Sequence, residues 1–138
     1  MARILCIDYG GKRTGIAVTD PLQIIATGLT TIDTKDFIPF LKKYTSTEQV
    51  ELFVIGEPKN WDDTDTHATA LVKAAVKRLE KEFPTIPIKK VDERFTSKMA
   101  KDAMLEMGLK KKDRRNKKLV DEIAATIMLQ EYLQSINS

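Results

Sequence analysis

The sequence predicts an α/β protein built on one mixed five-stranded sheet, with helices on both faces of that sheet. Two observations carry this prediction. Three β-type segments follow one another near the N-terminus with only short turns between them, which favours an antiparallel meander. Two later β-type segments each follow a helical pattern, and such a crossover places a strand parallel to a neighbour with a right-handed connection.

The meander is predicted at residues 3–9, 14–20 and 24–32. The first segment is an almost continuous apolar run, and the third is rich in β-branched residues, which suit a pleated surface. A glycine-rich turn that contains Lys12 and Arg13 joins the first two segments as a hairpin. The first strand therefore ends at a carboxylate, Asp8, beside glycines and cations.

The remaining elements follow from caps and spacing. A helix over about 35–46 tolerates Pro39 only because this proline lies near its first turn. Residues 51–56 are predicted as a buried strand, and a longer helix follows over about 65–83. One apolar stripe marks that longer helix, formed by Ala68, Leu71, Val72, Ala75, Val76, Leu79 and Phe83.

The C-terminal part begins with a strand over 86–92. Thr96 or Ser97 caps a helix that stops near Gly108, a residue favoured just after a helix. The last helix runs from about 117 to 135. The predicted order is therefore β-β-β-α-β-α-β-α-α. Without repeats or a long linker, residues 1–138 are expected to form one domain.

Composition narrows the class of protein. The 42% hydrophobic and 31% charged residues are typical of a soluble globular chain, and no apolar stretch approaches the roughly 20 residues of a membrane helix. Charged residues within the first twenty positions exclude a signal peptide. The single cysteine, Cys6, excludes an internal disulfide and a cysteine-based zinc cluster. We expect a cytoplasmic protein with no membrane partner.

The positive charge is unevenly distributed. Residues 110–118 hold seven lysines and arginines against one aspartate, although the whole chain has a net charge of only +3. The rest of the chain is therefore net acidic. Such a run is either a solvated loop or a contact for a phosphate backbone.

Acidic residues follow the strands that are expected to be parallel. Asp8 ends the first strand, Glu57 follows the fourth, and Asp92 and Glu93 end the fifth. In open sheets with parallel strands, sites form outside the carboxyl ends of those strands. Asp121 is expected to join them from the last helix, beside an apolar stripe of Val120, Ile123, Ala124 and Ile127 and the small Ala125, which lets the helix approach the sheet.

Several carboxylates in one place are costly unless a cation neutralises them. Oxygen ligands without histidine or cysteine favour Mg²⁺ or Mn²⁺ over zinc. Two such ions about 4 Å apart can activate a water and stabilise the leaving oxygen of a phosphodiester. This pattern predicts a metal-dependent nuclease that binds one or two ions.

Each of these residues could also have a purely structural role, with no part in metal or phosphate binding. Asp8 would merely shape the turn, and Glu93 would pair with Arg94 at the surface. Asp121 would be a first-turn helix residue that is favourable to the helix dipole. Lys12 and Arg13 would be solvated turn residues.

At this point the sequence resembles the YqgF family, also called RuvX, of the RNase H-like superfamily. The resemblance runs nearly end to end. Four stretches carry it: Ile7-Asp8-Tyr9-Gly10-Gly11-Lys12-Arg13-Thr14-Gly15-Ile16-Ala17-Val18-Thr19-Asp20, Val54-Ile55-Gly56 with Pro58 and Asn60, Asp92-Glu93-Arg94-Phe95-Thr96-Ser97, and Val120-Asp121-Glu122-Ile123-Ala124-Ala125.

The resemblance implies the RNase H-like fold, and it places the catalytic, metal-binding acids at Asp8, Glu93 and Asp121. It also implies a nuclease that processes the 5′ end of pre-16S ribosomal RNA or, alternatively, a Holliday junction resolvase. The family usually has a leucine-like residue where this chain has Glu57. This residue is therefore either a fourth ligand or an exposed substitution.

Three functions compete. The first is the nuclease, acting on structured RNA or branched DNA as a monomer or homodimer, with phosphates held by Lys12, Arg13, Arg94, Lys111, Arg114 and Arg115. The second is an actin-like ATPase, which would need two lobes where this length supplies one. The third is a nucleic-acid-binding module without turnover, which the basic segment would serve equally well.

Overall fold

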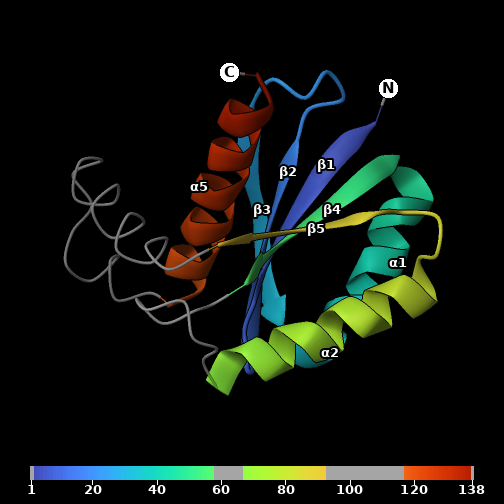
Figure 1. The fold of residues 1–138 in the computed structure, drawn as a ribbon, viewed down its shortest axis with the longest axis vertical. Coiled ribbons are helices and arrows are strands. Elements are labelled where there is room, and N and C mark those ends of the chain that lie inside the picture. The colour runs from blue at the N-terminus through green and yellow to red at the C-terminus, as the bar shows by residue number, and fades with distance from the viewer. Residues whose placement is uncertain (1, 58–66, 93–116, 138) are drawn as a thin grey trace.

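The computed structural model describes residues 2–57, 67–92 and 117–137. Its centre is a five-stranded sheet in the order β3-β2-β1-β4-β5 (Figure 1). The β1–β2 and β2–β3 pairs are antiparallel, whereas β1–β4 and β4–β5 are parallel. The predicted mixed sheet is thereby confirmed.

The elements of the described residues lie close to their predicted positions. In chain order they are β1 (Arg3–Tyr9), β2 (Arg13–Thr19), β3 (Ala26–Asp33), the short helix η1 (Thr34–Asp36), α1 (Phe37–Thr47), β4 (Val50–Glu57), α2 (His67–Glu82), β5 (Ile88–Asp92) and α5 (Lys117–Asn137). The helix predicted between Thr96 and Gly108 lies outside the described residues. None of the helices in these ranges is long and apolar enough to cross a membrane.

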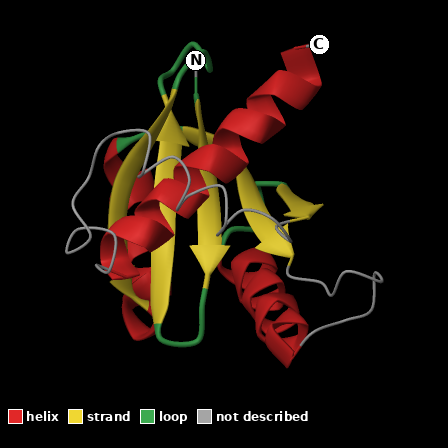
Figure 2. Ribbon diagram, turned by 90° about the vertical axis from the view of Figure 1, so that its left-hand side faces the viewer, coloured by secondary structure: helices red, strands yellow, loops and turns green. Residues whose placement is uncertain are grey.

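Two separate cores cover the two faces of the sheet. Leu5, Ile7, Phe53 and Ile55 pack with α1 and α2, whereas Ile4, Cys6, Ala17 and Val54 pack with α5. Figure 2 shows α5 crossing one face, with the other helices behind the sheet. Because successive side chains of a strand point to opposite faces, each residue of β1, β2 and β4 can be assigned to one core.

Helix α2 buries most of its predicted stripe, including Val72, Val76 and Leu79, but Leu71 is 42% exposed. Leu71, which the spacing assigns to this stripe, is therefore not buried with the rest of it. Its side chain lies over the turn between β1 and β2 instead, because its Cδ1 is 3.5 Å from the point where a β-carbon on Gly11 would be.

The glycine-rich turn is tied down by two threonines. The Thr34 hydroxyl donates to the carbonyl of Gly10 at 2.6 Å, and the Thr34 N–H donates to the carbonyl of Lys12 at 3.0 Å. The Thr14 and Thr34 hydroxyls lie 2.9 Å apart, and Thr14 is fully buried. Since Thr34 has already given its one hydroxyl hydrogen to Gly10, Thr14 donates to Thr34.

Replacing Thr34 by valine is expected to destabilise the fold by about 1–2 kcal/mol, because the buried Thr14 hydroxyl then loses its acceptor. Thr34→Ser, which keeps the hydroxyl, is the matched control. Urea denaturation measures both free energies of unfolding. Equal stability of the valine and serine variants would show that these hydrogen bonds do not hold the turn.

The loop between β2 and β3 is organised by Asp20. Its carboxylate accepts hydrogen bonds from the N–H groups of Leu22, Ile24 and Ile25 at 3.1, 2.9 and 2.8 Å. The hydrogen bond from Ile25 is the largest cause that lowers the pKa of Asp20. Burial opposes it, but the hydrogen bonds from Ile24 and Leu22 add to the lowering, so the pKa lies below its ordinary value of 3.8.

A carboxyl group with a depressed folded-state pKa stabilises the fold above its unfolded pKa and loses that contribution as the pH falls through the folded value. Asp20→Ala is therefore expected to lower the melting temperature at neutral pH. The difference from wild type should shrink once the pH falls below 3.8. Thermal melts across this range measure it, and a difference independent of pH would contradict the assignment.

Candidate metal centre and nucleic-acid interface

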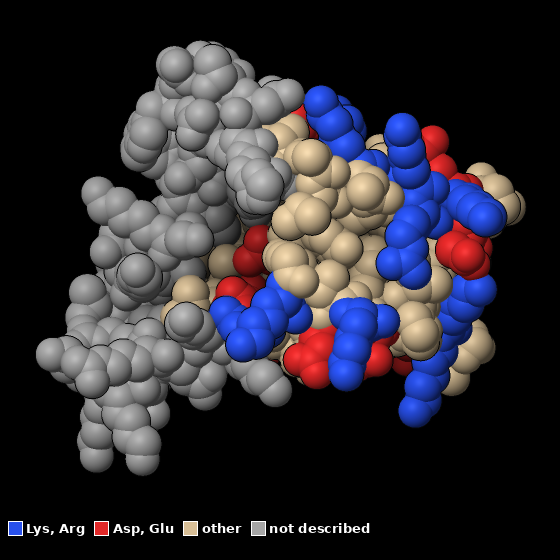
Figure 3. Space-filling view, turned by 90° about the horizontal axis from the view of Figure 1, so that it is seen from below, with Lys and Arg blue, Asp and Glu red and all other residues tan. Residues whose placement is uncertain are grey.

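The parallel strands end at one edge of the sheet, as the sequence predicts. Ile7 of β1 is aligned with Ile55 of β4, and Glu57 of β4 is aligned with Asp92 of β5. Asp8, Glu57 and Asp92 therefore share this edge. Seen from below, this end of the molecule shows acidic side chains beside lysine and arginine side chains (Figure 3).

Asp8 faces the α5 side of the sheet. It lies two residues after Cys6 and four after Ile4, which both pack in the core under α5. Its side chain is half-buried, and its register partner on β2 is Gly15. Gly15 is two residues before Ala17, which packs in the same core, so this position also faces α5.

Helix α5 makes its close approach to the sheet at Gly15. A β-carbon at this position would overlap the carbonyl oxygen of Asp121 and would lie 2.6 Å from its carbonyl carbon. Further along the helix, Ala125 is fully buried. The helix thus brings the backbone of Asp121 against β2, at the register partner of Asp8.

Asp121 is paired with Arg13. The Arg13 Nε donates to the Asp121 Oδ2 at 3.0 Å, and the two side chains are 23% and 26% exposed. Arg13 lies two residues before Gly15 on β2, so alternation directs it to the same face. Its neighbour Lys12 is exposed. The guanidinium that the sequence assigns to phosphate is therefore held at a proposed metal ligand.

Glu57 belongs to the opposite face. It lies two residues after Ile55, which packs with α1 and α2, and its Oε2 is 3.9 Å from the Lys90 Nζ. Alternation along β4 thus directs Glu57 away from the face that Asp8 occupies. Of the two interpretations that the sequence left open, a fourth ligand beside Asp8 is the less favoured by this geometry.

The other predicted site residues lie outside the described residues: Glu93, Arg94, Lys111, Arg114 and Arg115. Within residues 2–57, 67–92 and 117–137, no three acidic, histidine or cysteine side chains are grouped to hold a metal ion. Asp8 and Asp121 are the described members of the predicted triad. Their hard oxygen donors fit a divalent cation such as Mg²⁺, and the pairing of Asp121 with Arg13 shows that this carboxylate accepts a positive partner.

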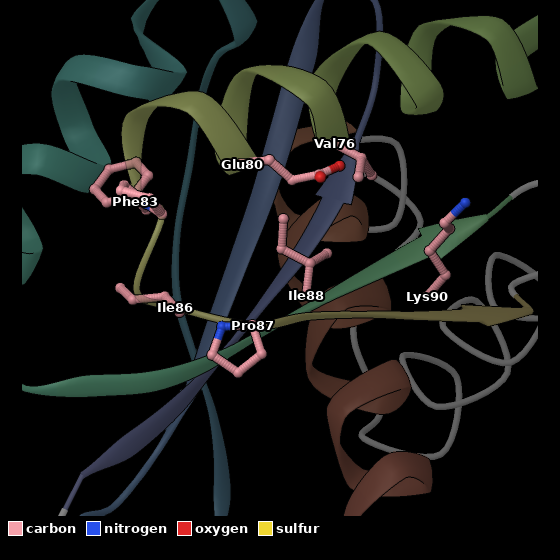
Figure 4. A pocket seen from close by; sticks show the side chains of 8 residues that line it. Val76, Glu80, Phe83, Ile86, Pro87, Ile88 and Lys90 are labelled. Atoms are coloured by element: carbon pink, nitrogen blue, oxygen red, sulfur yellow. The ribbon is translucent and has the colours of Figure 1, made fainter.

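A pocket of about 490 Å³ lies elsewhere, between the C-terminal half of α2 and strand β5. Figure 4 shows Val76 and Glu80 of α2 above Ile88, with Lys90 further along the strand. Val76 and Ile88 pack with the core under α1 and α2, on the face opposite to Asp8. The pocket is therefore separate from the candidate metal centre.

Two features of this centre were not predicted from the sequence. These are the contact of Gly15 with Asp121 and the ion pair of Arg13 with Asp121. The first had a signal, because an isolated glycine inside a strand often marks a close backbone approach. The second had none, since its partners are 108 residues apart in sequence.

Comparison with known proteins places this architecture in a family. A family model described as "RuvX: Holliday junction resolvase" matches residues 2–135. A relative from Christiangramia forsetii is 55% identical over 133 residues, covering 96% of this chain and 98% of its own length. A relative from Flavobacterium psychrophilum is 56% identical over 133 residues, with coverages of 96% and 97%. Both are named "Putative pre-16S rRNA nuclease".

A solved structure supports the fold independently. T. thermophilus RuvC in complex with a Holliday junction substrate superposes with a TM-score of 0.57 at 16% identity, covering 98% of this chain and 96% of that one. This likeness shows the RNase H-like fold that the sequence predicts. With a family model that spans nearly the whole chain and relatives at more than half identity, this protein belongs to the RuvX family.

Proposed function

We propose that this protein is a metal-dependent endonuclease that hydrolyses phosphodiester bonds, and that it processes the 5′ end of pre-16S ribosomal RNA in the cytoplasm. One observation supports it above the others. Asp8 and Asp121 are more than a hundred positions apart, yet Gly15 is the register partner of the first and contacts the backbone of the second, on the face that α5 covers. The names of the relatives supply the substrate.

In this proposal Asp8, Glu93 and Asp121 hold one or two Mg²⁺ or Mn²⁺ ions. When bound, such ions activate the attacking water and stabilise the leaving oxygen of the phosphodiester. The chain itself orients the backbone of the substrate. Phosphates are contacted by the basic side chains at this end of the sheet and in the segment beyond it: Lys12, Arg13, Arg94, Lys111, Arg114 and Arg115.

A second candidate, a Holliday junction resolvase, is favoured by the description of the matching family. It differs in its expected assembly. A resolvase that cuts two strands symmetrically needs a two-fold homodimer, whereas an RNA-processing enzyme can act as a monomer. The likeness to RuvC does not separate the two candidates, because it concerns the fold alone.

The discriminating experiment offers the protein two labelled substrates. One is a precursor 16S rRNA fragment with its 5′ extension, and the other is a four-way DNA junction. Each is incubated with Mg²⁺, with Mn²⁺ and with EDTA. Metal-dependent cleavage of the RNA alone supports the first candidate, and symmetric cleavage of the junction supports the second. Binding of both without cleavage would favour a non-catalytic module, and micromolar ATP binding would revive the ATPase.

Neutralising the basic segment is expected to weaken nucleic-acid binding. The variant with Lys111, Arg114 and Arg115 all replaced by glutamine should lose affinity for RNA and DNA alike. The slope of log K against log salt is negative, and its magnitude should decrease by about 2–3, since roughly one ion is released for each phosphate contact. Fluorescence anisotropy across a salt series measures this. An unchanged slope would identify the segment as a solvated loop.

A further inference from the structure

The ion pair between Arg13 and Asp121 joins two residues to which the proposed function gives different partners. Asp121 is a proposed metal ligand, and Arg13 is a proposed phosphate contact. In the structure the Arg13 Nε instead lies 3.0 Å from the Asp121 Oδ2, with about a quarter of each side chain exposed. One guanidinium and one carboxylate therefore satisfy each other where the metal and the phosphate are expected to bind.

This pair is not what fixes α5 on the sheet. The helix is already held by the backbone contact of Asp121 with Gly15 and by a buried row of side chains: Ala124, Ala125, Met128, Leu129 and Leu133. Partly exposed ion pairs add little to stability by comparison with such burial. The pair can open without undocking the helix.

A carboxylate that is paired with a guanidinium is a poorer ligand for a divalent cation. Oδ2 is engaged by Arg13. A guanidinium a few ångströms from the ion would also repel it. Binding of a metal at Asp121 therefore favours the arrangement in which Arg13 has left. Arg13 is the first residue of β2 and directly follows exposed Lys12, so its planar fork can contact a phosphate in two places at the end of the turn.

We propose that Arg13 is a positioning residue that exchanges partners, from Asp121 in the metal-free protein to a phosphate of the nucleic acid once a divalent cation binds. This inference rests on the proposed function. The exchange makes metal and nucleic acid bind cooperatively, because each favours the state in which the ion pair is open. By linkage, the coupling must be equal in both directions.

The first test measures nucleic-acid affinity without metal. A fluorescein-labelled RNA hairpin with a single-stranded 5′ extension is titrated in EDTA with wild type, Asp121→Asn, Arg13→Gln and the double variant. Asp121→Asn should bind about three- to fivefold more tightly than wild type, because Arg13 is released. Arg13→Gln should bind like wild type, and the double variant should bind like Arg13→Gln.

Asp8→Asn is the control for simple loss of negative charge, because it removes a carboxylate from the same face without removing the partner of Arg13. A gain of affinity in Asp8→Asn as large as in Asp121→Asn would overturn the exchange. Persistence of the gain in the double variant would also overturn it.

The second test measures the metal without activity. Binding of Mn²⁺ is followed by electron paramagnetic resonance in the absence of nucleic acid. Arg13→Gln should bind Mn²⁺ at least about fivefold more tightly than wild type, since the competing cation is gone. If the pair were only structural, the same variant would bind Mn²⁺ equally or more weakly, and the inference would fall.

The Mn²⁺ measurements distinguish failure of the proposed metal centre from failure of the partner exchange of Arg13. If Asp8→Asn and Asp121→Asn both bind Mn²⁺ as wild type does, the proposed metal centre is wrong. If those variants lose Mn²⁺ but Arg13→Gln binds it unchanged, the metal centre stands and the exchange is wrong.

Discussion

Replacing Asp8 by asparagine is expected to slow metal-dependent cleavage strongly while leaving the fold intact. Asparagine has the shape of aspartate but lacks its charge, and Asp8 is half-buried on the face that α5 covers. Loss of one anionic metal ligand should raise the barrier by about 3–4 kcal/mol, which corresponds to a rate loss of about 10²–10³-fold. Single-turnover cleavage of the precursor RNA fragment in Mg²⁺ measures this.

Asp36→Asn is the matched control. Asp36 is an exposed acid of η1, and no role in the site is assigned to it. Its variant should cleave at the wild-type rate. An Asp8→Asn protein that is folded by circular dichroism and cleaves as fast as the Asp36→Asn control would exclude Asp8 from the catalytic machinery.

The second large effect is expected at Gly15. A β-carbon here would overlap backbone atoms of Asp121, which cannot rotate out of the way as a flexible side chain can. Gly15→Ala therefore has to displace the start of α5 from the sheet. We expect a loss of about 3 kcal/mol or more in the free energy of unfolding, at the upper end for overpacking substitutions. Mn²⁺ affinity should fall as well, because Asp121 moves away from Asp8.

Gly11→Ala separates this contact from a general effect of losing glycine. A β-carbon on exposed Gly11 would be in ordinary contact, 3.5 Å from Leu71 Cδ1. The free energy of unfolding of the Gly11→Ala variant should lie within about 0.5 kcal/mol of the wild-type value, as is usual for surface substitutions. Denaturant unfolding of both variants measures the difference. A Gly15→Ala protein as stable as Gly11→Ala would mean that the close approach of α5 is not required.

The sheet was predictable because its signals are local. Apolar runs and turn residues mark each strand, and the chirality of helical crossovers makes β4 and β5 parallel to their neighbours. The convergence of Asp8 and Glu57 on one edge follows from that topology alone. Their separation onto opposite faces does not, because it depends on the register of β1 against β4, in which Ile7 is aligned with Ile55.

The docking of α5 was harder to predict. The sequence suggested a stripe of Val120, Ile123, Ala124 and Ile127, but Val120, Ile123 and Ile127 are only half-buried. Of that stripe only Ala124 is buried, and the other buried side chains lie on a neighbouring face of the helix: Ala125, Met128, Leu129 and Leu133. A helix that is apolar over more than one face does not reveal its orientation by periodicity. The orientation is set by Gly15, a partner distant in sequence, and the Arg13 ion pair follows from it.

The family resemblance predicts one site residue that the described geometry does not contain. It named Glu93 as the third acid, and Glu93 lies outside the described residues. Spacing alone could place it only at the end of β5, one residue after Asp92. Two of the three proposed metal ligands, Asp8 and Asp121, therefore lie in the described residues, and the third is a prediction. That the three share one cation is the central claim.

A crystal structure of the wild-type protein soaked in Mn²⁺ tests that claim most directly. Anomalous scattering at the manganese edge locates the ion without reference to any assumed ligand. We expect a peak within about 2.5 Å of carboxylate oxygens from Asp8, Glu93 and Asp121, with the Arg13 guanidinium turned away from Asp121. A peak bound elsewhere, or a Glu93 carboxylate directed away from an ion held by Asp8, would contradict the metal centre.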